Sequence, residues 1–293
     1  MVFSLQVFNI LKYGDKLPNL IPSAALIGNL DGMHLGHDHL IKVLEEQKTK
    51  HTIITFSNLN KDGLVLSTKA DKIDLLEKYD IDYLIILNFN QFKNIFYNEF
   101  IRLLKKLNIE EVVCGSDFRF GFKKEGDLFD LSSAFKVIEV PDFMIDGKRI
   151  SSSMIKKMNT LEEMEKYLGH HHIIRGKVIE GSHVGETIGF KTANLDVSKY
   201  KLPEDGVYAC KVSFLGRDYV GVLSIGHNPT INYQEEKRVE VHIIDFYRTI
   251  YGETLKIEFI QYIDKIYKFA DSEQLIQNIK KYVEIAKKLV ALS

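Results

Sequence analysis

The sequence has few of the features that would commit it to an oxidising compartment, a membrane or nucleic acid. Two of its 293 residues are cysteines, Cys114 and Cys210, and they form no CxxC pattern, so we expect reduced thiols and a cytoplasmic location. The net charge is -1, which excludes a global positive field for holding nucleic acid. No apolar run reaches the roughly 18 residues of a membrane span, and the N-terminal segment lacks the basic region and cleavage site of a signal peptide. These absences favour small-molecule chemistry, with neither nucleic acid nor a membrane as partner.

What the sequence does contain is ordinary for a globular protein. Hydrophobic residues make up 45% and charged residues 27% of the chain, a balance that argues against disorder. A domain typically takes about 100–200 residues, so the length allows two domains. The pattern of apolar residues changes past the middle of the chain, which divides it into two parts of different character.

The first part alternates short β-rich runs with helical patterns. Several runs are apolar at every position, as expected for strands buried on both faces. A helical stripe lies between two of them and consists of Phe96, Phe100, Leu103, Leu104 and Leu107. The runs are 24–28, 51–56, 82–87, 111–115 and 135–140. This alternation predicts an α/β domain with a parallel sheet and helices on both faces, whose ligand binds at the carboxyl ends of the strands.

The second part, from residue 173 onward, reads as strands joined by tight turns. No helical pattern interrupts these strands, so we expect an antiparallel β-barrel or sandwich, closed by a C-terminal helix that Asp271 caps. The predicted domains are therefore 1–169 and 173–293. The histidines of "GHHHI" (169–173) fall on this boundary, and we interpret them as linker residues and not as a metal site.

The stretch "GNLDGMHLGH" (28–37) stands where the first predicted strand turns into a helix. Its glycines let the backbone approach a phosphate, and the helix offers its positive end to an anion. His34 and His37 can donate hydrogen bonds to phosphate oxygens as charge develops on them. A helix cap and a metal site are the alternatives, and zinc is the weakest because no cysteine or third ligand stands nearby. Phosphate chemistry at the α-phosphate of a nucleotide is the favoured interpretation.

The longer string "IGNLDGMHLGH" resembles the HxGH signature of the nucleotidyltransferases, and in particular that of the bacterial bifunctional riboflavin kinase/FMN adenylyltransferases, or FAD synthetases. Further segments resemble motifs of this family in the same order along nearly the whole chain. They are "VVCGSDFRFGFKKEGD" (112–127), "GKRISSSMIKK" (147–157), "GFKTANL", "GVYA", "GHNPT" and "VEVHIIDF". The resemblance implies a Rossmann-like FMN adenylyltransferase domain at 1–169 and a riboflavin kinase barrel at 173–293.

In the first domain, the resemblance implies that His34 and His37 stabilise adenylyl transfer and that Asp117 contacts the flavin. Hydroxyl and guanidinium groups suit phosphate oxygens. The residues implied to bind ATP or its phosphates here are Gly28, Asn29, Gly36, Arg149, Ser152, Ser153 and Lys156. Taken alone, the serine run "SSS" is typical of a turn or helix cap.

In the second domain, "GSHVGETIGFKTANL" (181–195) is not a Walker A loop, because a phenylalanine stands where that motif needs glycine. The resemblance instead implies that Thr192 and Asn194 give oxygen ligands to Mg²⁺ bound to ATP. It further implies that Glu240 is the general base, and that Asn228 and Thr230 line the flavin pocket. On pattern alone, Glu240 is one polar position in an alternating strand.

The expected reactions are phosphorylation of riboflavin by ATP to give FMN, and then adenylyl transfer from a second ATP to FMN to give FAD and pyrophosphate. Three segments depart from the family pattern, namely "TFSNLN", "SSSMIKK" and "FKTAN". Two of the three lie in the adenylyltransferase half. A riboflavin kinase with a weakened or inactive adenylyltransferase domain is therefore the alternative, and a flavin- or nucleotide-sensing protein without turnover is a third.

Overall fold

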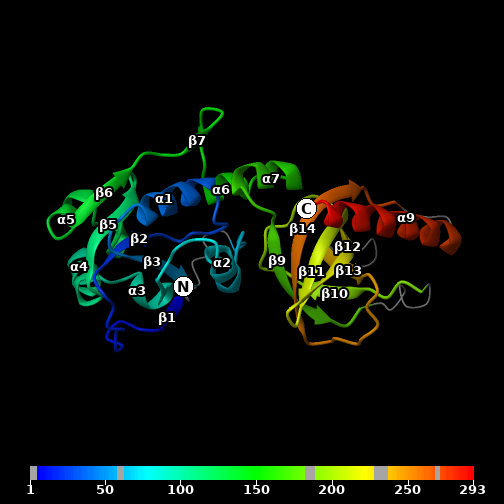
Figure 1. Ribbon diagram of the computed structural model, residues 1–293, viewed down its shortest axis with the longest axis horizontal. Helices are drawn as coiled ribbons and strands as arrows, with labels where there is room; N and C mark the ends of the chain where they lie inside the picture. The colour runs from blue at the N-terminus through cyan, green and yellow to red at the C-terminus, as the bar shows by residue number, and fades with distance from the viewer. Residues whose placement is uncertain (1–4, 58–62, 182–188, 228–236, 268–270) are drawn as a thin grey trace. The chain divides into compact units, whose positions relative to one another are not determined.

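The computed structural model describes residues 5–57, 63–181, 189–227, 237–267 and 271–293, and it divides into two compact units (Figure 1). Unit 1 comprises Met1–Gly63 and Ser67–Ser152, and unit 2 comprises Leu64–Leu66 and Ser153–Ser293. The units divide at Ser152, whereas the sequence places the domain boundary at 170–172. None of the helices in the described parts is long and apolar enough to cross a membrane.

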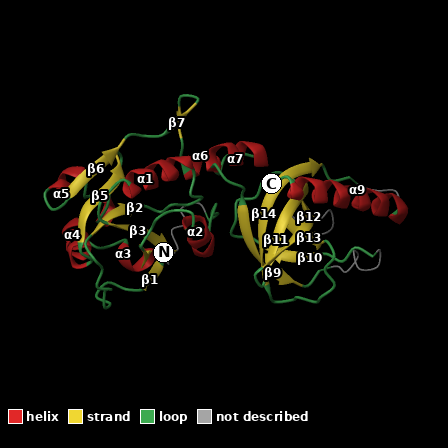
Figure 2. Ribbon diagram, in the orientation of Figure 1, coloured by secondary structure: helices red, strands yellow, loops and turns green. Residues whose placement is uncertain are grey.

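Unit 1 contains a parallel sheet of six strands in the order β1-β4-β3-β2-β5-β6 (Figure 2). The strands are β1 (Gln6–Ile10), β2 (Ser23–Ile27), β3 (Lys50–Ser57), β4 (Tyr83–Asn88), β5 (Ile109–Gly115) and β6 (Lys136–Val140). The helices are α1 (Leu35–Glu45), α2 (Lys69–Leu76), α3 (Phe89–Phe92), α4 (Tyr97–Lys106), η1 (Phe122–Lys124) and α5 (Leu128–Ser132), and a hairpin pairs β7 (Met144–Ile145) with β8 (Lys148–Arg149). The short helix α6 (Ser152–Ile155) starts at the last residue of unit 1, and its other residues are assigned to unit 2. The predicted parallel α/β sheet is confirmed.

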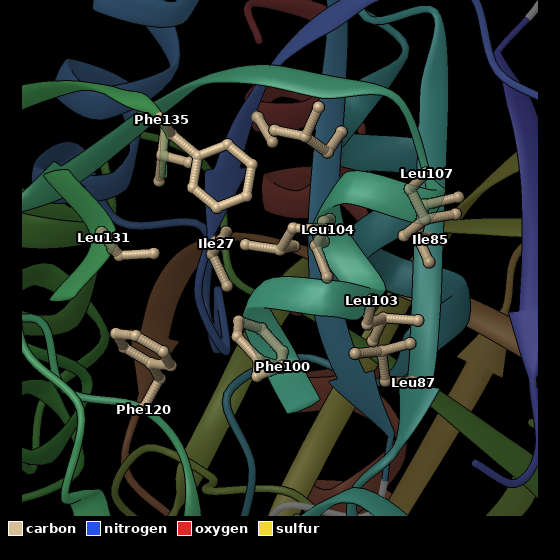
Figure 3. Packing of buried hydrophobic residues seen from close by; sticks show 14 of the residues in the cluster. Ile27, Ile85, Leu87, Phe100, Leu103, Leu104, Leu107, Phe120, Leu131 and Phe135 are labelled. Carbon is tan, nitrogen blue, oxygen red and sulfur yellow. The ribbon is translucent and has the colours of Figure 1, made fainter. Parts of the chain in front are cut away.

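Apolar side chains of β2 point alternately to the two faces of this sheet. Ile27 packs with the α4 side, where Figure 3 shows Phe100, Leu103, Leu104 and Leu107 facing Ile85 and Leu87. Leu26 packs on the other face with Ile41 of α1. Every position of β2 is buried, as expected for a strand covered on both sides. Phe96 was predicted to belong to the α4 stripe, but it stands at the N-cap and is 54% exposed, because the helix begins only at Tyr97.

Unit 2 contains a closed barrel of six strands in the order β10-β13-β12-β11-β14-β9. The elements are α7 (Leu161–Leu168), β9 (Ile173–Ile179), β10 (Ala193–Asp196), β11 (Gly206–Phe214), β12 (Arg217–His227), β13 (Lys237–Ile243), β14 (Thr254–Asp264) and α9 (Ser272–Ala291). All pairs in the barrel are antiparallel, so of the two predicted architectures the barrel is the one formed. Asp271 caps α9 as predicted, since its carboxylate accepts from the Gln274 N–H at 2.9 Å.

The barrel is filled from the inner faces of its strands, and α9 covers part of the outside (Figure 2). On β13, Val239 and Val241 belong to the interior cluster. Side chains alternate along a strand, so Glu240 and His242 point to the outer face. Tyr282 and Ala286 of α9 are buried against a different part of the outer surface.

The segments around Val65 and His172 are also part of the barrel unit. Val65 donates its N–H to the Lys199 carbonyl and accepts from the Lys201 N–H, both at 2.8 Å. His172 is buried, stacks on Phe259 with ring centroids 5.7 Å apart, and its Nε2 lies 2.9 Å from the Lys201 carbonyl. The interpretation of this histidine as a linker residue was therefore wrong, because it belongs to the packed unit.

Candidate active sites

Residues 28–34 form a tight turn between β2 and α1, at the carboxyl end of the parallel sheet, and residues 35–37 begin the helix. Three residues of the turn have positive φ angles, namely Leu30 (53°), Gly32 (83°) and Met33 (44°). Left-handed conformations are unfavourable for residues with a side chain, and here the buried side chains of Leu30 and Met33 anchor the turn in the core. The turn is thus held in one shape before any ligand binds.

His34 and His37 lie together at the start of α1. His34 is the N-cap residue, and its Nδ1 accepts from the His37 N–H at 3.3 Å. The two rings stack with centroids 3.6 Å apart and planes inclined by 17°. A Cβ at position 36 would lie 3.2 Å from the His34 ring, so Gly36 allows this close approach. His34 therefore caps the helix, and the pair also stands where a helix N-terminus attracts phosphate.

The protonation of His37 is set by its surroundings. Its ring is partly exposed as a whole, but Nδ1 is shut off from solvent and has no hydrogen-bond partner among the described residues. Burial, the neighbouring His34 ring and the charge of Lys72 lower the pKa of His37 well below 6.5. At neutral pH the imidazole is uncharged, and it can donate one hydrogen bond to an anion.

A network of hydrogen bonds behind the turn includes residues that the sequence did not single out. The buried carboxylate of Asp31 accepts from the Ser67 N–H at 3.0 Å, and the Ser67 hydroxyl accepts from the Gly32 N–H at 2.7 Å. Ser152, a predicted phosphate ligand, donates its hydroxyl to the Asp31 carbonyl at 2.8 Å. The structure thus brings Ser152 next to the turn, although it is 121 positions away from Asp31 in sequence.

Asn29 is held from behind by two donors. Its carbonyl oxygen accepts from the Thr55 hydroxyl at 2.9 Å and from the Lys72 ammonium, whose Nζ is also 3.4 Å from Asn29 Oδ1. Gly28, the residue before it, donates its N–H to the Ile54 carbonyl at 3.0 Å. Lys72 was missed in the sequence, where it is one of several lysines in a helical pattern. The capping-box spacing of Thr68 and Asp71 was the available signal that a helix begins there.

Arg149 and Asp117, which were predicted as a phosphate ligand and a flavin contact, form an ion pair with each other. Arg149 Nη2 lies 2.7 Å from Asp117 Oδ2, and Arg149 Nε lies 3.0 Å from Asp142 Oδ1. Both members of the first pair are largely exposed, so solvent screens the interaction. Ser153 and Lys156 lie in or just after α6 and fall in unit 2, the first exposed and the second half-buried.

The predicted kinase residues meet on the outer face of the barrel. Thr192 Oγ1 lies 3.4 Å from Glu240 Oε2, and Asn194 stands directly opposite Glu240 in the register of β10 and β13. Leu195 belongs to the barrel interior, so the alternating side chain of Asn194 points outward, as that of Glu240 does. A Cβ at Gly181 would overlap the Asn194 amide, so the missing side chain there makes room for Asn194.

A pocket adjoins this group. His242 Nδ1 lies 2.9 Å from the Lys191 carbonyl, and the Phe190 ring meets the His242 ring edge-on at 5.3 Å. The pocket residues are Val178, Lys191, Thr192, Ala193, Val241, Ile243, Phe246, Arg248, Thr249, Ile250 and Tyr251. Its lining is mostly apolar and includes the cationic residues Lys191 and Arg248.

Two predicted flavin contacts, Asn228 and Thr230, lie outside the described residues, as do residues 182–188 of the glycine-rich segment. Within the described ranges, no group of three or more His, Cys, Asp and Glu side chains could hold a metal ion. The oxygen atoms of Thr192 and Asn194 are donors of a different kind, and hard cations such as Mg²⁺ prefer them.

The chain matches known families over both of its parts. The family model of FAD synthetase matches residues 17–154, and that of riboflavin kinase matches residues 168–290. A crystal structure of a macrolide-efflux protein from Streptococcus pneumoniae is 30% identical, superposes with a TM-score of 0.79, and covers 96% of this chain and 98% of that chain.

Curated relatives carry both families in one polypeptide. The bifunctional riboflavin kinase/FMN adenylyltransferase of Buchnera aphidicola subsp. Schizaphis graminum is 33% identical over 91% of this chain and 93% of its own. The protein of the same name from Listeria monocytogenes is 35% identical over 87% of this chain and 88% of its own. The chain belongs to the family of bifunctional riboflavin kinase/FMN adenylyltransferases.

Proposed function

We propose that the chain phosphorylates riboflavin with ATP to give FMN and ADP, and then transfers an adenylyl group from ATP to FMN to give FAD and pyrophosphate. The domain at 1–169 carries the adenylyl transfer, and the domain at 173–293 carries the kinase reaction. The observation that carries the proposal is the stacked pair of His34 and His37 at the N-terminus of α1, at the carboxyl end of the sheet. The free, buried thiols of Cys114 and Cys210 are consistent with a cytoplasmic setting.

In the adenylyl transfer, an FMN phosphate oxygen forms a bond to the α-phosphorus of ATP, and the bond from that phosphorus to the α,β-bridging oxygen breaks. Pyrophosphate takes the electron pair of the broken bond. His34 and His37 donate hydrogen bonds to the phosphate oxygens as negative charge grows on them, and the start of α1 adds its dipole. Positioning and electrostatics suffice, because no covalent enzyme intermediate is needed.

The other predicted residues of this domain bind the substrates. Ser152 lies within hydrogen-bond distance of the phosphate turn, and its hydroxyl would turn from the Asp31 carbonyl to donate to an ATP phosphate. Arg149 is paired with Asp117, so binding of an anion replaces a carboxylate partner by phosphate oxygens, and Asp117 becomes available to the flavin. The remaining phosphate ligands in this proposal are Gly28, Asn29, Gly36, Ser153 and Lys156.

In the kinase reaction, Glu240 accepts the proton of the riboflavin 5'-hydroxyl while that oxygen attacks the γ-phosphorus of ATP and ADP leaves. Thr192 and Asn194 supply a hydroxyl and an amide oxygen beside this carboxylate, and these donors fit Mg²⁺. Mg²⁺ held by these two side chains would neutralise charge on the ATP phosphates. Asn228 and Thr230 complete the flavin pocket in this proposal.

The proposal is tested with two assays on the purified protein. Riboflavin with ATP and Mg²⁺ is expected to give FMN, and FMN with ATP and Mg²⁺ is expected to give FAD and pyrophosphate in equal amounts. Abundant FMN without FAD would contradict the bifunctional proposal and would show that the protein is a riboflavin kinase only. Binding of riboflavin and ATP without formation of FMN or FAD would favour a sensing protein without turnover. Removal of Mg²⁺ with a chelator is expected to stop the formation of FMN.

A further inference from the structure

Lys72 is a lysine in an unusual position. It lies on α2 and is only 6% exposed, whereas Lys69, one turn earlier on the same helix, is exposed. Burying an ammonium group is costly unless hydrogen bonds compensate, so such a residue is retained only where its charge is held in place. Its Nζ donates to the Asn29 carbonyl and also lies 3.4 Å from Asn29 Oδ1.

This position places a positive charge at the phosphate turn. Asn29 follows Gly28 directly at the end of β2, so the ammonium group lies at the start of the turn. After burial and the His34 ring, the charge of Lys72 is the third cause that lowers the pKa of His37. A carbonyl oxygen repels phosphate, but that of Asn29 is engaged by Lys72 and Thr55 together. Lys72 therefore acts on two predicted members of the adenylyltransferase site at once.

We propose that Lys72 is a positioning residue for adenylyl transfer, which fixes Asn29 through its ammonium group and holds a positive charge at the phosphate turn. The inference rests on the proposed adenylyltransferase function. The ammonium charge stabilises the negative charge that develops on the phosphates, as preorganised charges in a water-poor site do. It also opposes protonation of His37, so the imidazole stays in the neutral form that donates a single N–H.

The experiment compares the full-length Lys72→Met protein with the wild type, and uses Lys69→Met as the matched control. Methionine keeps much of the volume and removes the charge. FAD formation from FMN is expected to lose about 100-fold in kcat, by analogy with the loss of one preorganised donor. Formation of FMN from riboflavin is expected to stay unchanged, and Lys69→Met is expected to behave as the wild type in both assays.

A second readout does not depend on turnover. The ring-proton signals of His37, assigned by comparison with a His37→Gln protein, are followed by NMR against pH without substrates. Removing the charge is expected to move the midpoint of His37 to higher pH in Lys72→Met, and Lys69→Met is expected to leave it in place. Should Lys72→Met fail to fold, Lys72→Gln offers the same test of charge, because its amide can still donate to Asn29.

The outcomes separate this inference from the proposed function. A wild type that makes FMN but no FAD refutes the adenylyl transfer itself, whereas the His37 titration still reports on Lys72. A variant that makes FAD at the wild-type rate, with an unchanged His37 midpoint, overturns the inference. A general loss of both activities together with a lower unfolding temperature would assign Lys72 a structural role only, which also overturns it.

Discussion

The imidazole rings of His34 and His37 are stacked at a centroid distance of 3.6 Å, and His34 Nδ1 accepts the backbone N–H of His37. Because Nδ1 of His34 accepts this bond, its own proton stands on Nε2. Two positive rings at this distance would repel each other strongly, so the pair does not become doubly protonated at neutral pH. His37, whose pKa is lowered well below 6.5, is therefore a neutral donor for an anion at this turn.

Substitution of His37 by alanine is expected to stop FAD formation and to leave FMN formation intact. The loss follows from removing a donor to the reacting phosphate, which typically costs ~10²–10³ in rate. Product analysis by chromatography, with FMN or riboflavin as the starting flavin, measures both activities. His39→Ala is the matched control, since His39 is on the same helix but contacts Phe143. Equal loss of both activities in His37→Ala would contradict the assignment of two separate sites.

The stability of the protein is expected to fall as the pH drops below 6.5. The folded state holds His37 neutral because its pKa is lowered well below 6.5, while the unfolded chain takes up a proton near that value. Acid therefore favours the unfolded state, with a slope of at most about 1.4 kcal/mol per pH unit for one proton. Urea unfolding at several pH values measures this. His37→Gln is expected to flatten the dependence, and parallel curves for the two proteins would contradict the prediction.

Glu240→Gln is expected to abolish FMN formation and to leave FAD formation from added FMN unchanged. The amide has nearly the shape of the carboxylate but accepts no proton from the riboflavin hydroxyl, and a positioned base contributes ~10²–10⁴ in rate. Glu258→Gln is the control, because Glu258 lies in β14 of the same barrel and pairs with Lys211. If the Glu240→Gln protein formed FMN at the wild-type rate, Glu240 would not be the general base.

Gly181→Ala is expected to impair the kinase without destabilising the barrel. The added methyl group would overlap the Asn194 amide, which lies at the end of a flexible side chain and can turn away. Turning away removes a proposed Mg²⁺ ligand, so the kinase is expected to need a higher Mg²⁺ concentration. Titration of riboflavin phosphorylation with Mg²⁺ checks this, and thermal unfolding is the control. An unchanged Mg²⁺ requirement would argue against Asn194 as a ligand.

Both halves of the fold were predictable because their periodicity is strong. The run 24–28 has no polar side chain, which is typical of strands inside a parallel sheet, and all five predicted strands of the first part formed. The first strand of the sheet, β1, was missed. Only Ile10 of its five residues is buried.

The candidate sites were predictable only in part. His34 and His37 share one turn, and Thr192 and Asn194 share one strand end, so local sequence places each pair. Contacts with distant segments were not visible, because nothing local indicates that Ser67 would meet a residue 35 or 36 positions away. His172 was misjudged for the same reason, since it packs against Phe259 of the neighbouring strand β14, 87 positions away in sequence.

Val65 also shows how the barrel unit depends on a remote piece of chain. Its backbone completes hydrogen bonds at Lys199 and Lys201, so residues 64–66 belong to a unit that is otherwise made from residue 153 onward. On the ribosome, these three residues emerge long before their partners and must wait for them. A gene exchange that replaced the kinase half through a single crossover near residue 153 would therefore need a matching segment at 64–66 to preserve these bonds.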